Sequence, residues 1–196
     1  MDATTNEGMI LAIVLIVIAV AAIAAVYLYR RRQSQRLKVR FGTEYRRTVK
    51  QLGGETKAEA ELRRREARMA KLNIRPLTVT EAERFGDAWT RVQGRFVDNP
   101  RGAVADADKL VTELMTARGY PMSDFDRRAA DISVDHPRVV DSYRSAQLIA
   151  VKDSRGEADT EELRRAIVHY RTLFADLLQV HTPSNAAEPG HVAVQP

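Results

Sequence analysis

The chain has 196 residues, with 31 basic and 26 acidic side chains and a formal net charge of +5. It contains no cysteine, which excludes a disulfide framework, a thiolate zinc site and a cysteine nucleophile. The charge is unevenly distributed: residues 30–72 hold 15 basic and 5 acidic side chains, whereas residues 73–196 hold 16 basic and 19 acidic ones. The acidic excess in residues 73–196 argues against a basic nucleic-acid-binding domain there.

Residues 9–29 form an uninterrupted apolar segment, MILAIVLIVIAVAAIAAVYLY, without a single charge. A helix of this length spans roughly 30 Å, the thickness of a bilayer's hydrocarbon core, and satisfies its own backbone hydrogen bonds there. A cleavable signal peptide would have a basic n-region and a shorter core, and a core helix of a soluble domain would not be apolar on every side. We therefore predict a transmembrane helix at 9–29 after a short extracytoplasmic N-terminus at 1–8.

Six basic side chains follow this segment with no acid among them, whereas no Lys or Arg precedes it. They are Arg30, Arg31, Arg32, Arg36, Lys38 and Arg40. Because positive charge within about 15–20 residues of a membrane end stays on the cytoplasmic side, we expect the N-terminus outside and the C-terminal domain in the cytoplasm. The same side chains would attract anionic lipid headgroups of the cell membrane.

Residues 30–72 are predicted to form a basic helical stalk. Apolar side chains recur at steps of three and four over residues 33–52, which favours one helix that ends at Gly53-Gly54. A capping-box spacing from Thr56 to Glu59 predicts the start of the next helix. That helix carries the run Arg63-Arg64-Arg65, which we interpret first as a solvated face, then as a contact to lipid headgroups, and last as a contact to nucleic acid.

Residues 73–180 show helical spacing without strand-like alternation, which predicts a small bundle of four or five helices. Expected helices cover about 81–97 after a capping box at Thr80, Pro100 to Gly119, 123–132 with a cap at Ser123, 137–152, and 160–180. The aromatic residues at helical spacing are expected in the core, namely Phe85, Trp89, Phe96, Tyr120, Tyr143, Tyr170 and Phe174. The tail at 181–196 lacks periodicity and is expected to be disordered. The predicted fold class is therefore all-α: one N-terminal transmembrane helix, a basic stalk and a small bundle.

Five short segments together resemble a family of uncharacterised bacterial proteins that have an N-terminal membrane segment and a helical remainder. The segments are Arg40 to Tyr45, Ile74 to Leu77, Trp89 to Gln93, Arg118 to Pro121 and Asp131 to Pro137. The resemblance extends to about Leu178 and implies one anchored unit in a bacterial envelope. It implies no activity, cofactor or catalytic residue.

The densest polar cluster consists of Asp131, Asp135 and His136. An Asp–His pair can orient an imidazole for general-base catalysis, and two aspartates can share a metal ion with a histidine. Helix capping by Ser133 or Asp135, with Pro137 in the first turn of the next helix, explains the same residues more simply. Because the sequence also lacks a nucleophile elbow and a phosphate loop, we predict no catalytic, cofactor or metal site, with this cluster as the weak alternative.

The sequence thus favours a non-enzymatic interaction or scaffold protein that presents a helical domain at the inner face of a bacterial membrane. Its expected partners are the lipid bilayer, with anionic headgroups, and an unidentified protein. One alternative is a small-ligand receptor or enzyme with a site near Asp131, Asp135 and His136. Another is a membrane-tethered nucleic-acid binder through residues 57–72, which the charge distribution disfavours. The oligomeric state stays open.

Overall fold

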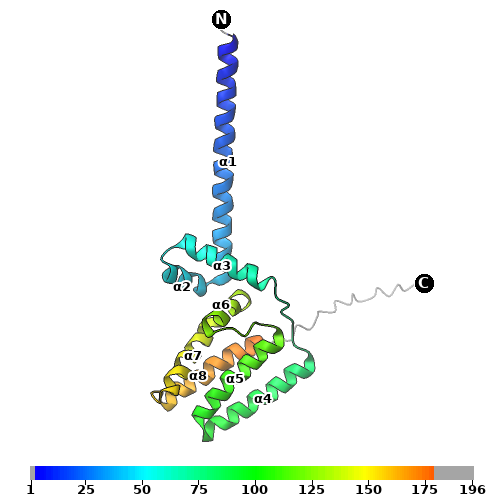
Figure 1. The fold of residues 1–196 in the computed structure, drawn as a ribbon, viewed down its shortest axis with the longest axis vertical. Coiled ribbons are helices and arrows are strands. Elements are labelled where there is room, and N and C mark those ends of the chain that lie inside the picture. The colour runs from blue at the N-terminus through cyan, green and yellow to red at the C-terminus, as the bar shows by residue number, and fades with distance from the viewer. Residues whose placement is uncertain (1–2, 179–196) are drawn as a thin grey trace, which may run out of the picture. The chain divides into compact units, whose positions relative to one another are not determined.

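A computed structural model describes residues 3–178, and their side chains from Val14 onward; the tail predicted at 181–196 lies outside the described residues. Within 3–178 the chain forms helices and no strand, which confirms the predicted fold class (Figure 1). The helices are α1 (Ala3–Phe41), α2 (Thr43–Leu52), α3 (Glu55–Met69), α4 (Val79–Asp98), α5 (Pro100–Arg118), α6 (Phe125–Asp135), α7 (Val140–Ser154) and α8 (Thr160–Leu177).

The chain divides into two compact units that do not follow its linear order. The first unit consists of Met1–Lys71 together with Ala129–Asp141, and the second of Leu72–Arg128 together with Ser142–Pro196. We predicted that the stalk would end at residue 72 and that residues 73–180 would form a contiguous bundle. The structure instead places thirteen residues of that stretch, 129–141, with the stalk helices.

Helix α1 is continuous over 39 residues, so the predicted N-terminal segment 1–8 is already helical from Ala3. Its part from Val14 to Phe41 is long and apolar enough to cross a membrane by length and composition. None of the apolar stretch is buried within the described part of the chain. An apolar helix without a protein partner is typical of a segment that is covered by something other than its own domain.

The predicted single helix over 33–52 is wrong, because the chain turns at Gly42 between α1 and α2. Gly42 has φ +50° and ψ −115°, a conformation that side chains with a Cβ rarely adopt. The predicted capping box at Thr56 is also wrong: α3 begins at Glu55 after Gly54, without a side-chain cap. The sharp turns allow α2 and α3 to lie across the C-terminal end of α1 (Figure 1).

The core of the first unit is made by apolar side chains from α1, α2, α3 and the end of α6. Leu37, Phe41 and Tyr45 are buried as their helical spacing predicted, and Leu62 is fully covered. Ile132 is also fully buried in this unit. The four helical segments therefore share one core although α6 comes some 60 residues later in the chain.

In the second unit, α4 and α5 form a helical hairpin whose ends are set by local sequence. Thr78 and Glu81 form a reciprocal capping box at the start of α4, two residues before the box that we predicted at Thr80. Asn99 accepts a hydrogen bond from the Gly102 N–H at the start of α5, as the Asn-Pro pattern indicates. Gly119, with φ +93°, ends α5 as predicted.

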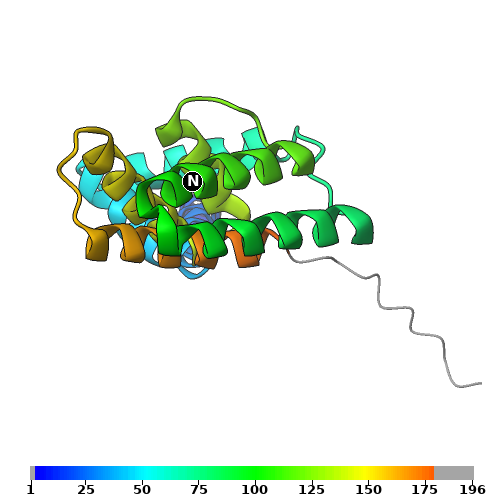
Figure 2. The ribbon, with the colours of Figure 1, turned by 90° about the horizontal axis from the view of Figure 1, so that it is seen from below.

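Helix α5 also lies beside α8, and the two helices run in the same direction. Arg118 at the end of α5 donates a hydrogen bond of 3.0 Å to the carbonyl of Leu177, the last residue of α8. Figures 1 and 2 both show α5 next to α4 and α8. Trp89 of α4 stacks on Phe174 of α8 with ring centroids 4.8 Å apart, so α4 reaches the same core.

The predicted boundaries around α6 and α7 need correction. Asp124, and not Ser123, caps α6 by accepting a hydrogen bond from the Arg127 N–H. The helix runs three residues beyond the expected end at Ile132, and Pro137 lies in the turn that follows. Helix α7 begins only at Val140, so Pro137 does not occupy its first turn.

Candidate functional site

The six basic residues that follow the apolar segment fall into two groups with different surroundings. Arg30, Arg31 and Arg32 are exposed on α1 and have no hydrogen-bond or ion-pair partner among residues 3–178. They follow directly on the exposed apolar side chains that end at Tyr29. Their guanidinium groups are therefore available to bind an external anion.

The other three basic residues are paired with glutamates of α3. Arg40 lies 2.7 Å from Glu66, Arg36 lies 3.7 Å from the same carboxylate, and Lys38 lies 3.1 Å from Glu55. Arg40 also donates a hydrogen bond of 3.3 Å to the Val134 carbonyl in the segment from α6. These pairs link the end of α1 to α3, and the two glutamates offset part of the charge of the three cations.

The arginine run 63–65, which we expected to face solvent, is split by the fold. Arg64 is exposed and Arg63 makes an exposed pair with Glu59. Arg65, however, is only 8% exposed at its side chain and lies 2.7 Å from Glu44, whose side chain is fully buried. The expectation of a solvated face is therefore wrong for Arg65, which belongs to a buried ion pair between α2 and α3.

Arg65 also connects the stalk helices to the segment from α6. Its guanidinium donates to Glu61 at 3.2 Å and to the Ser133 hydroxyl at 3.4 Å. Ser133 in turn donates to the Ala130 carbonyl at 2.6 Å. Ser133 therefore lies inside α6 as part of a buried network, and the predicted capping role for it is wrong.

The three residues of the predicted polar cluster, Asp131, Asp135 and His136, have different environments. Asp131 is buried and pairs with Arg68 at 3.2 Å. Asp135 is exposed as the last residue of α6, and His136 is half-buried in the following turn. Across residues 3–178 no group of three or more His, Cys, Asp or Glu side chains is arranged to hold a metal ion. Asp131 therefore contributes to packing of the first unit.

The aromatic residues expected in the core are in the core of the second unit, with Phe96 half-buried. The hydroxyl of Tyr170 donates a hydrogen bond of 2.9 Å to Asp108. Burial, and then the adjacent Asp108 carboxylate, raise the pKa of Tyr170, so this hydroxyl keeps its proton. These aromatic side chains fill space between helices.

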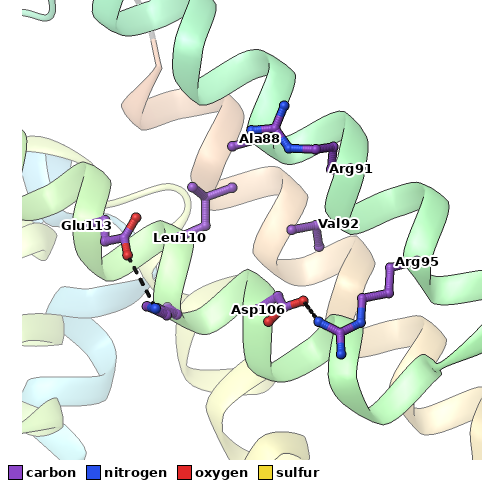
Figure 3. A pocket seen from close by; sticks show the side chains of 8 residues that line it. Ala88, Arg91, Val92, Arg95, Asp106, Leu110 and Glu113 are labelled. Atoms are coloured by element: carbon purple, nitrogen blue, oxygen red, sulfur yellow. Dashed lines mark hydrogen bonds and ion pairs between the residues drawn. The ribbon is translucent and has the colours of Figure 1, made fainter.

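A groove that the sequence did not indicate lies between α4 and α5 (Figure 3). It consists of two adjoining hollows of about 320 and 490 Å³, which share Ala88, Arg91, Leu110 and Glu113 in their walls. Arg95 of α4 reaches across to Asp106 of α5 and forms an ion pair at one end (Figure 3). The groove could have been found only once the pairing of α4 with α5 was known.

Protein-family models, curated proteins and solved structures were all compared with the chain, and none of them matches it.

Proposed function

We propose that the chain is a single-pass membrane protein whose N-terminus lies outside and whose two helical units lie at the cytoplasmic face of a bacterial membrane. There it acts as a non-enzymatic interaction protein that gathers a protein partner next to anionic lipid. The single observation that carries the proposal is the end of α1, where an exposed apolar helix continues directly into three exposed arginines that have no partner in the described part of the chain.

The apolar part of α1 supports the membrane location because it exposes a continuous hydrophobic surface. Its large side chains between Val14 and Tyr29 are 47–70% exposed. Burial of apolar surface is favourable by about 25 cal/mol per Å², so water is a poor environment for such a helix and a bilayer is a good one. All the backbone hydrogen bonds of a helix are made internally, as a lipid environment requires.

The positions of the basic residues along α1 support contact between Arg30–Arg32 and lipid headgroups. With a rise of 1.5 Å per residue, these three lie within about 5 Å of Tyr29 along the helix axis. A headgroup layer is roughly 5–7 Å thick, so their side chains reach it. Arg36, Lys38 and Arg40 lie about 10–17 Å beyond Tyr29, and each is paired with one of two glutamates of α3.

The interaction role is favoured over an enzymatic one by the place of Asp131. This carboxylate belongs to the alternative cluster of Asp131, Asp135 and His136, yet it is buried against Arg68 and serves the packing of the first unit. Confinement to a membrane raises the effective concentration of a binding module for partners on the same surface. A tethered helical protein gains affinity in this way without further contacts.

Orientation can be tested by cysteine labelling, because the chain has no cysteine of its own. Thr5→Cys and Gln51→Cys are treated in intact cells with a maleimide that cannot cross the membrane. We expect labelling of Thr5→Cys in intact cells, and of Gln51→Cys only after the cells are opened. The opposite pattern would refute the proposed orientation, and labelling of both in intact cells would refute the span.

The role of the three arginines can be tested with matched charge reversals. Changing Arg30, Arg31 and Arg32 to Glu should reduce the fraction of chains with the N-terminus outside, since it removes three of the six positive charges that follow the span. The control reverses Lys57, Arg64 and Lys71, which are also exposed and make no side-chain pair within residues 3–178. Equal effects of the two sets would contradict the proposal.

The interaction role is tested with a labelling enzyme fused after Pro196 of the full chain. Cytoplasmic proteins should be enriched over those that the same enzyme marks when it is fused to an unrelated single-pass anchor. No enrichment would refute the interaction role, whatever the orientation.

A further inference from the structure

We propose that the groove between α4 and α5 is a docking site for an acidic amphipathic helix of a protein partner. The inference deepens the proposed interaction role and rests on it, because it names the surface and the chemistry of the partner. It is carried by the charge, the shape and the pairing of the side chains that line the groove.

The charge of the groove is opposite to that of the surrounding chain. Its walls carry four cations, Arg84, Arg91, Arg95 and Lys109, and two carboxylates, Asp106 and Glu113. The excess of two positive charges contrasts with residues 73–196, which have 16 basic and 19 acidic side chains. A local excess of positive charge favours a ligand that brings carboxylates.

Internal ion pairs show which cations are available to that ligand. Arg95 is paired with Asp106 (Figure 3), and Lys109 lies 3.9 Å from Glu113. Arg91 is exposed and has no partner in the described part of the chain, and Arg84 lies 4.9 Å over the ring of Phe85 without a carboxylate. The excess charge therefore belongs to Arg84 and Arg91, which a carboxylate can engage through two parallel hydrogen bonds.

The spacing of these two arginines sets the spacing of the carboxylates that they would bind. Arg84 and Arg91 are seven residues apart on α4, which corresponds to two helical turns and about 10 Å. Two acidic residues seven positions apart on a second helix have the same separation. A partner helix with this pattern would present both carboxylates to α4 at once.

The groove has the length of a short helix and an apolar floor. Its lining extends from Arg84 to Arg95 on α4 and over 106–117 on α5, which is about 17 Å or three turns on each helix. Val92 and Leu110 lie in the floor between the charged walls (Figure 3). An apolar floor with charged rims is the arrangement in which an amphipathic helix buries its apolar side.

The test uses the full chain in nanodiscs of zwitterionic phosphatidylcholine and two synthetic helical peptides of about four turns. One peptide has glutamates seven positions apart beside a leucine stripe, and the other has lysines in place of those glutamates. We expect the glutamate peptide to bind, and the lysine peptide to bind at least about tenfold more weakly. Failure of the glutamate peptide to bind, or equal binding of the two, would overturn the proposal.

A pair of double variants locates the binding. Arg84→Glu with Arg91→Glu should weaken the glutamate peptide by about tenfold or more, because attraction becomes repulsion. The matched control is Arg155→Glu with Arg171→Glu, which reverses two exposed arginines of the same unit outside the groove and should leave binding unchanged. Unchanged emission of Trp89 in both variants verifies that they fold. Equal losses of peptide binding in the two variants would overturn the proposal. The proposal would also be overturned if duplex DNA or anionic vesicles bound the groove more tightly than the glutamate peptide does.

The groove and the interaction role can fail separately. If the fused labelling enzyme enriches the same proteins with the Arg84→Glu/Arg91→Glu chain as with the natural one, the groove inference is wrong and the interaction role stands. If the natural chain enriches nothing, the interaction role is wrong. The peptide titration still tests whether the groove binds an acidic helix. Loss of enrichment only in the groove variant supports both.

Discussion

Replacing Arg65 by methionine should destabilise the first unit far more than the same change at the adjacent Arg64. Arg65 lies 2.7 Å from Glu44, whose side chain is fully buried. Removing the guanidinium takes a charge-assisted hydrogen bond from a carboxylate that cannot reach water, at a cost of about 3 kcal/mol. This figure is at the lower end of the range for breaking a buried ion pair.

Hydrogen exchange of the full chain in nanodiscs measures this loss where it occurs. A loss of about 3 kcal/mol should speed the exchange of the most protected amides in α3 by roughly 100-fold. The fluorescence of Trp89, the only tryptophan, reports on the second unit and serves as an internal reference. Arg64→Met is the matched control: its side chain is exposed, so exchange should change by less than about twofold.

A second variant separates the loss of the pair from the loss of packing. Adding Glu44→Leu to Arg65→Met removes the carboxylate that lost its guanidinium, so the double variant should exchange more slowly than Arg65→Met alone. Two results would refute the reasoning from a buried ion pair. One is equal exchange rates in Arg65→Met and Arg64→Met, and the other is faster exchange in the double variant than in Arg65→Met alone.

Two further predictions concern the second unit and are followed by thermal unfolding of the full chain with Trp89 fluorescence. Gly119 has φ +93° and a Cβ there would lie 2.6 Å from a backbone carbonyl, so Gly119→Ala should cost about 2 kcal/mol or more. Gly94 lies inside α4 with open space at the Cβ position, so Gly94→Ala should instead stabilise by about 0.5–1 kcal/mol; shifts in the same direction would contradict the argument. A hydrogen bond from Arg75, and then backbone hydrogen bonding at the helix start, lower the pKa of Glu81 from 4.5 to about 2. Because the pKa is lower in the folded state, the charged form stabilises α4 above about pH 4.5 and this contribution is lost as the pH falls toward 2. The natural chain should therefore lose its advantage over Glu81→Gln in that pH range, and a difference that is independent of pH would show that the carboxylate charge is not responsible.

Local features of the second unit were predictable because they depend on neighbouring residues. Pro100 starts α5 and Gly119 ends it, as predicted. The capping box of α4 was placed two residues too late, at Thr80 in place of Thr78, because both threonines have a glutamate three residues ahead. Hydrogen bonding in the fold, and not spacing, selects between such equivalent pairs.

The candidate site was predictable only in part. The basic residues after the apolar segment are visible in the sequence, but their division into Arg30–Arg32 and the three residues paired with α3 is not. The pairing depends on the turn at Gly42, which lies within the single helix that the apolar spacing predicts over 33–52. The turn at Gly42 thus affects which charges remain available to a lipid surface.

The sequence by itself determined the helical class, the apolar segment with its arginines, and most of the aromatic core, because hydrophobic periodicity and composition are properties of consecutive residues. Only the tertiary structure decided that Arg65 is buried, that residues 129–141 join the stalk helices, and that α4 and α5 enclose a groove. The physical reason is that the sequence around a charged residue does not show whether a distant residue will pair with it. Glu44, for example, lies 21 residues from its partner Arg65. Long-range partners are selected by the packing of whole helices, and no local pattern records that choice.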